Sequence, residues 1–292
     1  MSRVGELIDE GVAALAAVGR IDNPRGEARM LLAVATGWET ATVFGYPERE
    51  VAPEATARYR DFVQRRVSGE PAAHITGVRE FWSLPFKVTA DTLVPRPDTE
   101  AVIELALQSF EGRPKPEALL DLGTGTGCLL LALLSEFQSA TGLGLDISRA
   151  ALAVAKENAE RLDLAERAAF SLADFAEAPE GPFDLVVSNP PYIASADIAD
   201  LEIEVRKYDP HAALDGGADG LDAYRTIFQA APGRLTEDGI LIFEVGAGQA
   251  SDVRALGEKA GMLLLSLRKD LAGIERALAF CKKGVGIPRA AV

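Results

Sequence analysis

Apolar residues recur at intervals of three and four along the first part of the chain, which is the spacing of one face of an α-helix. Between residues 4 and 15 the apolar positions are Val4, Leu7, Ile8, Val12 and Leu15. Ser2 precedes this run and is of the residue type that caps helix N-termini. The pattern therefore predicts a first helix that begins just after Ser2.

Two further helices are predicted before residue 70. Asn23 and Pro24 form a start signal, a capping residue followed by proline at the first helical position. In this second helix, Met30, Leu31 and Val34 are expected to face the protein core. The third helix is expected to open at Pro53, to end at Gly69, and to bury Tyr59, Phe62, Val63 and Val67. Together these helices predict a small bundle.

The pattern changes after Pro71. Residues 74–97 carry glycine, several prolines and alternating apolar residues, which predict a hairpin or an extended linker. Asp98 and Thr99 are expected to cap the helix that follows. The chain is thus divided into a helical domain at 1–73, a linker at 74–97 and a larger domain at 98–292.

Strand-like and helix-like segments then alternate to the end of the chain. Predicted strands lie at 118–122, 143–146, 169–172, 183–188, 239–245, 262–267 and 277–281. Predicted helices lie at 128–137, 148–162, 220–235 and 249–260. Apolar strands alternating with helices predict an α/β fold, doubly wound, with a mainly parallel sheet covered on both faces.

Composition narrows the classes of protein to consider. The chain has 292 residues, two cysteines and two histidines, which disfavours a disulfide framework and a His/Cys metal site. We expect no metal.

No apolar run reaches the ~18 residues of a membrane span, and the N-terminus lacks the apolar stretch of a signal peptide, so we expect a cytoplasmic protein with no membrane partner. Net charge is −14, of which residues 87–292 hold −12. That charge argues against a nucleic-acid substrate.

A glycine-rich loop follows the first strand of the larger domain. Gly123, Thr124, Gly125, Thr126 and Gly127 lie between a predicted strand and a predicted helix. Glycines there allow a ligand to approach the backbone closely, and helix N-terminal amides would face it. Asp146, at the end of the next strand, is placed to accept hydrogen bonds from the two ribose hydroxyls of a nucleoside. The loop thus predicts a nucleoside-containing cofactor.

Two details bear on which cofactor this is. The glycines run G-x-G-x-G rather than the G-x-G-x-x-G of dinucleotide enzymes. Asp121, just before the loop, suits a cationic amino group, as in S-adenosylmethionine, better than a pyrophosphate. After the third strand, Asp174 is a candidate acceptor for an adenine amino group, and Phe175 is a candidate stacking partner.

The strongest chemical signal is the tetrapeptide Asn189-Pro190-Pro191-Tyr192 at the end of an apolar strand. An amide or aromatic –NH₂ group is a poor nucleophile because its lone pair is delocalised. The Asn189 side-chain oxygen and the Pro190 carbonyl are two acceptors able to hold its two N–H bonds. They would fix the nitrogen in line with an electrophilic methyl group. We expect Asn189, Pro190 and Tyr192 to be catalytic, with Tyr192 packed on the planar target.

At this point the sequence resembles the protein methyltransferases that modify the glutamine of the Gly-Gly-Gln motif in peptide chain release factors. The resemblance covers nearly the whole chain. It is carried most specifically by 77–82 (GVREFW) and 93–100 (LVPRPDTE), and also by 204–210, 213–221, 244–246 and Gln249. Asp98 and Asp209 stand where glutamate is more usual, and Phe175 where tryptophan can occur.

The resemblance implies a class I methyltransferase domain, Rossmann-like with a seven-stranded sheet, and a helical domain that helps to grip the release factor. It implies that S-adenosylmethionine is the cofactor, bound by 123–127, Asp146, Phe175 and neighbours that include Asn189. It also implies that the substrate glutamine is bound by Asn189, Pro190, Pro191 and Tyr192, with Leu93 and Arg96 near the methyl group. We expect a monomer that binds release factors and no nucleic acid directly.

Three alternatives stay open on the residues alone. An adenine or cytosine amino-methyltransferase acting on nucleic acid would share the tetrapeptide, but the acidic charge opposes it. A nicotinamide- or flavin-dependent oxidoreductase would share the doubly wound fold, but the glycine spacing opposes it. A non-catalytic binding module would keep the fold, yet Asp146, Asn189 and Tyr192 are all present.

Overall fold

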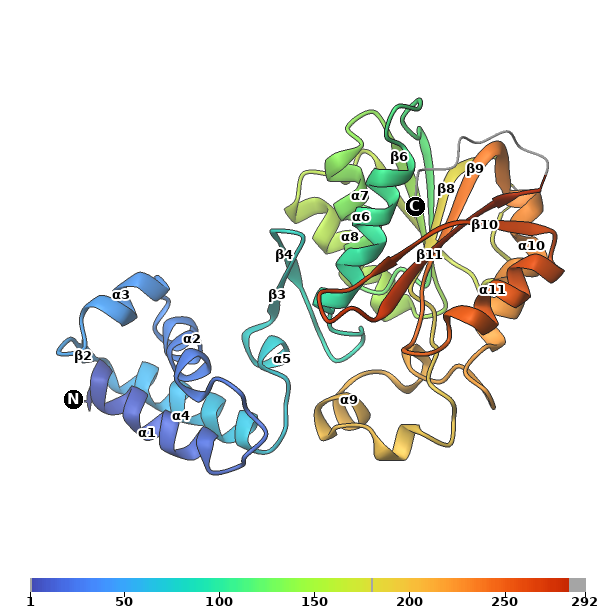
Figure 1. Cartoon of the computed structure of the whole chain (residues 1–292). Coiled ribbons are helices and arrows are strands. Elements are labelled where there is room, and N and C mark those ends of the chain that lie inside the picture. The colour runs from blue at the N-terminus through green and yellow to red at the C-terminus, as the bar shows by residue number, and fades with distance from the viewer. Residues whose placement is uncertain (1, 180, 284–292) are drawn as a thin grey trace. The chain divides into compact units, whose positions relative to one another are not determined.

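The computed structural model describes residues 2–179 and 181–283. The chain forms two compact units (Figure 1). The first unit consists of Met1–Val78 together with Glu202–Tyr208, and the second of Arg79–Leu201 together with Asp209–Val292. The chain therefore leaves the first unit, builds half of the second, returns for one short segment, and leaves again.

The first unit is a helical bundle. Its elements are β1 (Ser2–Arg3), α1 (Val4–Ala16), α2 (Pro24–Thr36), α3 (Thr40–Gly45), β2 (Glu50–Val51), α4 (Pro53–Val67), α5 (Ala72–Thr76) and α9 (Ile203–Tyr208). Leu7, Leu31 and Tyr59 are fully buried where α1, α2 and α4 meet. The Tyr59 hydroxyl donates a hydrogen bond to the Leu7 carbonyl at 3.0 Å, so this buried polar group is satisfied.

The predicted start of the second helix is confirmed, because the Asn23 side chain accepts a hydrogen bond from the Gly26 amide at 2.9 Å. The predicted cap at Ser2 is wrong. Ser2 pairs with Val51 in a two-stranded sheet, and Arg3 occupies the N-cap position of α1. Val34 was also expected in the core, but it is 44% exposed, because the buried stripe of α2 runs through Leu31, Leu32 and Ala35.

The returning segment α9 is joined to the bundle by a buried arginine. The Arg66 side chain, 5% exposed, lies 2.6 Å from Glu27 on α2 and 2.6 Å from Glu204 on α9. Gly69 lies against Ile203, with no room for a side chain on that glycine. Two carboxylates thus neutralise one buried guanidinium, and the bundle includes residues from far along the chain.

The second unit is built on a seven-stranded sheet with the order β10-β11-β9-β8-β5-β6-β7. The strands are β5 (Ala118–Leu122), β6 (Thr141–Asp146), β7 (Ala168–Leu172), β8 (Phe183–Ser188), β9 (Leu235–Glu244), β10 (Met262–Lys269) and β11 (Glu275–Lys282). β5 to β9 run parallel, and β11 is antiparallel to both its neighbours.

Helices cover both faces of this sheet (Figure 1). The helices are α6 (Glu100–Ser109), α7 (Cys128–Glu136), α8 (Arg149–Arg161), α10 (Asp222–Arg234) and α11 (Ala250–Lys259). Alternate residues of each strand enter opposite cores: Leu185 packs with α6 and α7, whereas Val186 packs with α10. The predicted doubly wound, mainly parallel fold with a helical N-terminal part is confirmed.

The predicted hairpin is present as β3 (Val78–Phe81) and β4 (Leu84–Lys87). The fully buried Asn158 side chain on α8 accepts from the Lys87 amide at 2.7 Å and donates to the Lys87 carbonyl at 3.0 Å. It also donates to the Thr126 carbonyl at 2.9 Å. One side chain therefore holds both the hairpin and the glycine loop.

Candidate active site

Three polar segments meet at the carboxyl edge of the sheet. β5 lies between β6 and β8, with Leu122 paired to Leu145 on one side and to Ser188 on the other. The segments that follow these strands are therefore neighbours: the glycine loop after β5, Asp146 at the end of β6, and the tetrapeptide after β8. Open parallel sheets bind their ligands at this edge.

The glycine loop adopts a conformation that needs its glycines. Gly123, Gly125 and Gly127 have φ values of 76°, 54° and 80°, a left-handed region that is costly for other residues. Asp146 fixes the loop from the next strand, since its Oδ2 accepts from the Gly125 amide at 2.9 Å and its Oδ1 from the Ser148 amide at 2.8 Å. Each carboxylate oxygen keeps a lone pair for a ligand.

A chamber of about 320 Å³ opens over this loop. Its lining includes eight of the predicted residues, which are Leu93, Gly123, Gly125, Asp146, Asp174, Phe175, Asn189 and Pro191. A narrower chamber of about 50 Å³ is lined by residues that include Leu93, Arg96, Asp121, Thr124, Thr126 and Asn189. Leu93, Gly123, Gly125 and Asn189 line both chambers, so the two form one continuous site.

Asp121 carries an unused acceptor at the narrow end. Its carboxyl group is almost fully buried, and its Oδ2 accepts from the Thr124 hydroxyl at 2.6 Å. Its Oδ1 is buried without a hydrogen-bond partner among the described residues. Burial raises the pKa of Asp121 to about 7. A buried carboxyl with a free acceptor fits the cationic amino group that the sequence predicts there.

The 174–178 loop forms the side of the wider chamber. Asp174 Oδ1 accepts from the amides of Ala176 and Glu177, both at 2.8 Å. The buried Arg234 at the end of α10 donates to the carbonyls of Phe175, Ala176 and Ala178 at 2.7, 2.9 and 2.9 Å. Arg234 was not predicted from sequence. It fixes the backbone of Phe175, which is expected to stack on adenine, and of the residues that follow it.

The tetrapeptide is anchored on both sides. The Ser188 hydroxyl donates to the Leu122 carbonyl at 2.7 Å, and Gln249 Nε2 donates to the Tyr192 carbonyl at 2.8 Å. Asn189 Nδ2 donates to the Thr99 hydroxyl at 3.4 Å, which leaves Asn189 Oδ1 as the acceptor for an incoming N–H. Stiff prolines and these anchors make a preorganised binding surface.

The remaining predicted residues lie around the two chambers. Pro190 is buried, and Tyr192 is half-buried with its hydroxyl donating to Glu244 at 3.4 Å. Gly127 occupies the N-cap position of α7. Arg96 is paired with the fully buried Asp209 carboxylate at 2.7 Å, which holds the 93–96 segment in place.

Sequence reasoning missed some of the lining residues. Ile147, directly after Asp146, is 62% exposed and lines the wider chamber, as do Pro210, Ala212 and Ala213. An apolar residue that follows a ribose-binding acid was a usable signal for Ile147. The other three belong to the short 3-10 helix His211–Ala213 and its N-cap Pro210, which is too short for hydrophobic periodicity to reveal.

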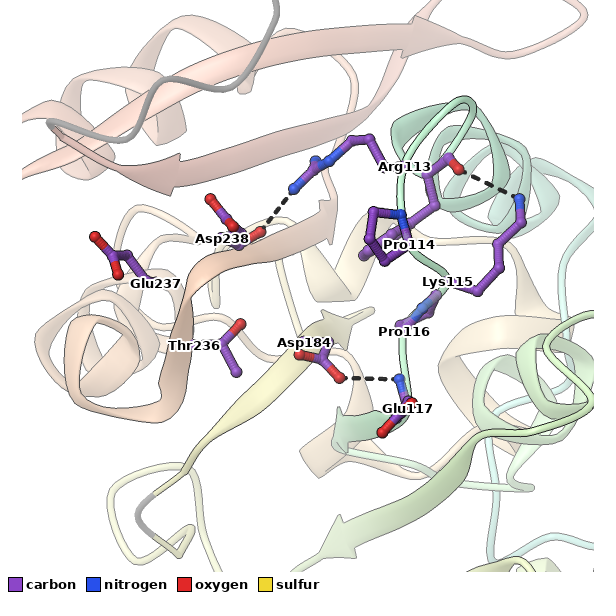
Figure 2. A pocket seen from close by; sticks show the side chains of 10 residues that line it. Arg113, Pro114, Lys115, Pro116, Glu117, Asp184, Thr236, Glu237 and Asp238 are labelled. Atoms are coloured by element: carbon purple, nitrogen blue, oxygen red, sulfur yellow. Dashed lines mark hydrogen bonds between the residues drawn. The ribbon is translucent and has the colours of Figure 1, made fainter.

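A larger hollow of about 530 Å³ lies at the opposite edge of the sheet (Figure 2). Its polar groups are engaged with the protein itself: Arg113 donates to the Asp238 carbonyl at 3.0 Å, and Asp184 accepts from the Glu117 amide at 2.9 Å (Figure 2). Asp184 therefore stabilises the start of β5. Groups arranged in this way support the fold and leave little for a ligand to bind.

Two absences apply to the residues that the structure describes. Within 2–179 and 181–283, no cluster of three histidine, cysteine or acidic side chains is arranged to hold a metal ion. In the same residues, no helix is long and apolar enough to cross a membrane.

Comparison with solved structures agrees with this fold. The hMettl16 catalytic domain, solved in complex with the MAT2A 3'UTR hairpin 1, superposes with a TM-score of 0.54 at 17% identity. The match covers 85% of this chain and 88% of that chain. At such low identity it is evidence for the fold alone.

Sequence comparison is more specific. The family described as the PrmC N-terminal domain matches residues 6–77, and a methyltransferase domain family matches residues 115–243. The release factor glutamine methyltransferase of Rhodospirillum rubrum is 46% identical over 283 residues, 97% of this chain and 86% of that protein. The protein of the same name from Bradyrhizobium diazoefficiens is 44% identical over 94% of this chain and 95% of its own length. Because identity at this level extends across the helical unit, the linker and the sheet alike, the chain belongs to the family of release factor glutamine methyltransferases.

Proposed function

We propose that this protein transfers a methyl group from S-adenosylmethionine to the side-chain amide nitrogen of the glutamine in the Gly-Gly-Gln motif of a peptide chain release factor. The observation that carries the proposal is the orientation of Asn189. Its amide nitrogen is engaged by Thr99, so its oxygen is available to a planar –NH₂ group beside the chamber that holds Asp146.

The cofactor site consists of Asp121, residues 123–127, Asp146, Asp174 and Phe175, with Asn189 at the junction of the two chambers. S-adenosylmethionine, when bound, supplies an electrophilic methyl group on a sulfonium. The free oxygen of Asp121 would accept from its amino group, and Asp146 from its ribose hydroxyls. Phe175 and Ile147 would pack against the adenine ring.

Substrate binding falls to the tetrapeptide. The Asn189 side-chain oxygen and the Pro190 carbonyl would each accept one N–H of the glutamine amide, while Tyr192 and Pro191 pack on its plane. These acceptors stabilise the transition state more than the ground state. As the nitrogen lone pair forms the new bond to the methyl group, the N–H bonds become more acidic and their hydrogen bonds to the acceptors strengthen. Positioning and electrostatics then lower the barrier without a strong general base. Leu93 and Arg96 would lie near the methyl group.

The same proposal covers the organisation of the chain and its partner. Residues 1–73 would contact the release factor, residues 74–97 would link the two domains, and residues 98–292 would carry out methyl transfer. We propose that the protein acts as a monomer in the cytoplasm, on a protein partner and without direct nucleic-acid binding. Deleting residues 1–73 is expected to leave cofactor binding intact while methylation of the whole release factor falls.

The direct test is mass spectrometry of a purified bacterial release factor after incubation with this protein and S-adenosylmethionine. A single added methyl, located by fragmentation on the glutamine of Gly-Gly-Gln, is the expected result. A parallel assay with DNA and RNA tests the amino-methyltransferase alternative. Methyl transfer to nucleic acid, with none to the release factor, would overturn the proposal.

A further inference from the structure

The mechanism so far makes no use of Glu244, a buried acid directly behind the tetrapeptide. Glu244 is the last residue of β9, the neighbour of β8, and it is 1% exposed. Its Oε1 accepts from the Tyr192 hydroxyl at 3.4 Å, and the Thr99 side chain lies beside the carboxylate. Its Oε2 is buried with no hydrogen-bond partner among the described residues. Burying such a group is costly, so its place beside two site residues requires an explanation.

Thr99 connects this acid to Asn189. Thr99 stands at the N-cap position of α6, yet its side chain makes no capping hydrogen bond, which corrects the prediction that it caps this helix. Its hydroxyl instead lies between Asn189 Nδ2 and Glu244. A threonine hydroxyl has one hydrogen to donate. Burial raises the pKa of Glu244 to about 7, and above that pH the carboxylate can only accept. In this ionised form the Thr99 hydrogen points to Glu244, and the hydroxyl offers Asn189 a lone pair.

The direction of these hydrogen bonds determines which way the Asn189 amide faces. A lone pair on Thr99 attracts the –NH₂ end of Asn189, so its oxygen points toward the substrate. In the reversed amide, the Asn189 oxygen would meet the Thr99 oxygen, and the –NH₂ end would face the incoming donor. Such a site would repel a glutamine –NH₂ group instead of binding it.

We infer that Glu244 is a positioning residue, which acts through Thr99 to orient the Asn189 amide and directly to hold the Tyr192 hydroxyl. The inference rests on the proposed function, since it assigns Glu244 to the recognition of a donor –NH₂ group. Glu244 touches neither substrate nor cofactor in this scheme. Its negative charge is balanced by Arg276, which lies between Asp98 and Asp270.

Replacing Glu244 with glutamine tests the inference, because it keeps the size of the side chain but adds a donor. The –NH₂ group introduced by Glu244→Gln can donate to Thr99, which then turns its own hydrogen toward Asn189 and favours the reversed amide. We expect this substitution to lower kcat for release factor methylation by ~10- to 100-fold, the scale of losing one preorganised acceptor. The Kd for S-adenosylmethionine should stay within about twofold, because Glu244 lies outside both chambers.

Thr99 variants separate orientation from general damage. Thr99→Ser keeps the hydroxyl and should lower kcat much less than Thr99→Val, which removes the hydroxyl at equal volume and should lower kcat as Glu244→Gln does. In the Thr99→Val background, adding Glu244→Gln should cost at most ~3-fold more, because the shared connection is already broken. Asp270→Asn is the matched control. It changes another carboxylate on Arg276 that contacts neither Thr99 nor Tyr192, and it should leave kcat unchanged.

The outcomes distinguish the two proposals. If the wild-type protein methylates the release factor and a folded Glu244→Gln variant keeps kcat within twofold, the positioning role is wrong. Fully additive effects of Thr99→Val and Glu244→Gln would also overturn it, because they would mean that the two residues act separately. If the wild-type protein itself leaves the glutamine unmodified, the proposed function fails first.

Discussion

Arg234 offers a test of how the cofactor site is supported, because it acts on the 174–178 loop without lining either chamber. Replacing Arg234 with methionine keeps most of the apolar stem and removes three hydrogen bonds to the carbonyls of Phe175, Ala176 and Ala178. Burial lowers the pKa of Arg234, whereas the nearby charge of Asp174 favours its charged form.

The loss of stability and of cofactor affinity depends on whether each carbonyl finds another hydrogen-bond donor once the guanidinium is removed. Phe175 and Ala176 lie at the surface of the loop, where water can replace the guanidinium. Ala178 is buried, and leaving its carbonyl unpaired costs about 1–3 kcal/mol of stability. Cofactor binding loses only what the loop contributes, which is one aromatic contact and one hydrogen bond, each worth about 0.5–1.5 kcal/mol. The Kd for S-adenosylmethionine should therefore rise by ~5- to 150-fold.

Isothermal titration calorimetry with S-adenosylmethionine measures this directly, and thermal unfolding reports the loss of stability. Arg254→Met is the matched control, because it removes an arginine from an exposed ion pair with Glu258 on α11. Its Kd should not change. A folded Arg234→Met variant whose Kd stays within twofold of wild type would refute the reasoning, and would mean that the loop holds its conformation without the guanidinium.

Three further predictions concern other parts of the molecule. Asn189→Ala should lower kcat by at least ~100-fold with little change in cofactor affinity, since one of two fixed acceptors is lost; single-turnover assays would reveal near-normal chemistry if this is mistaken. Burial raises the pKa of Asp121 to about 7, so the fraction of ionised Asp121 able to bind a cationic amino group grows as pH rises from about 6 to about 8. The affinity for S-adenosylmethionine should therefore increase over that range. In a calorimetric titration, Asp121→Asn should abolish the increase. Arg66→Met should destabilise the helical unit by about 1–3 kcal/mol and speed amide hydrogen exchange in α9, because two partly exposed carboxylates lose their shared cation. Unchanged exchange in α9 would mean that the ion pair does not hold α9 on the bundle.

Most of the sheet and its helices could be predicted from the sequence because their apolar patterns are long and regular. The strands at 118–122 and 183–188 match the structure residue for residue. α9 was missed, since none of its six residues is buried and so short a helix has no clear period. Val34 was predicted in the core because it is apolar and at helical spacing, whereas the bundle buries a neighbouring stripe of α2.

The chemical residues were found where they end a strand, as Asp146 does, or directly follow one, as Asn189 does. Glu244 and Arg234 were missed for a different reason. Each acts by a contact with a segment far away in the sequence, so only the fold brings the partners together. The Thr99 side chain shows the limit most clearly, because its residue type and position favour a helix cap, and a tertiary contact uses its hydroxyl instead.

The return of the chain at Glu202–Tyr208 has a consequence for synthesis. A ribosome releases the helices of residues 4–76 first, but Arg66 then has only Glu27 as a carboxylate partner. Glu204 emerges after β8 and the Asn189–Tyr192 segment have been made. The bundle therefore reaches its final form late in translation, so a truncated product that ends before residue 202 would carry an incomplete helical unit with a half-neutralised buried arginine.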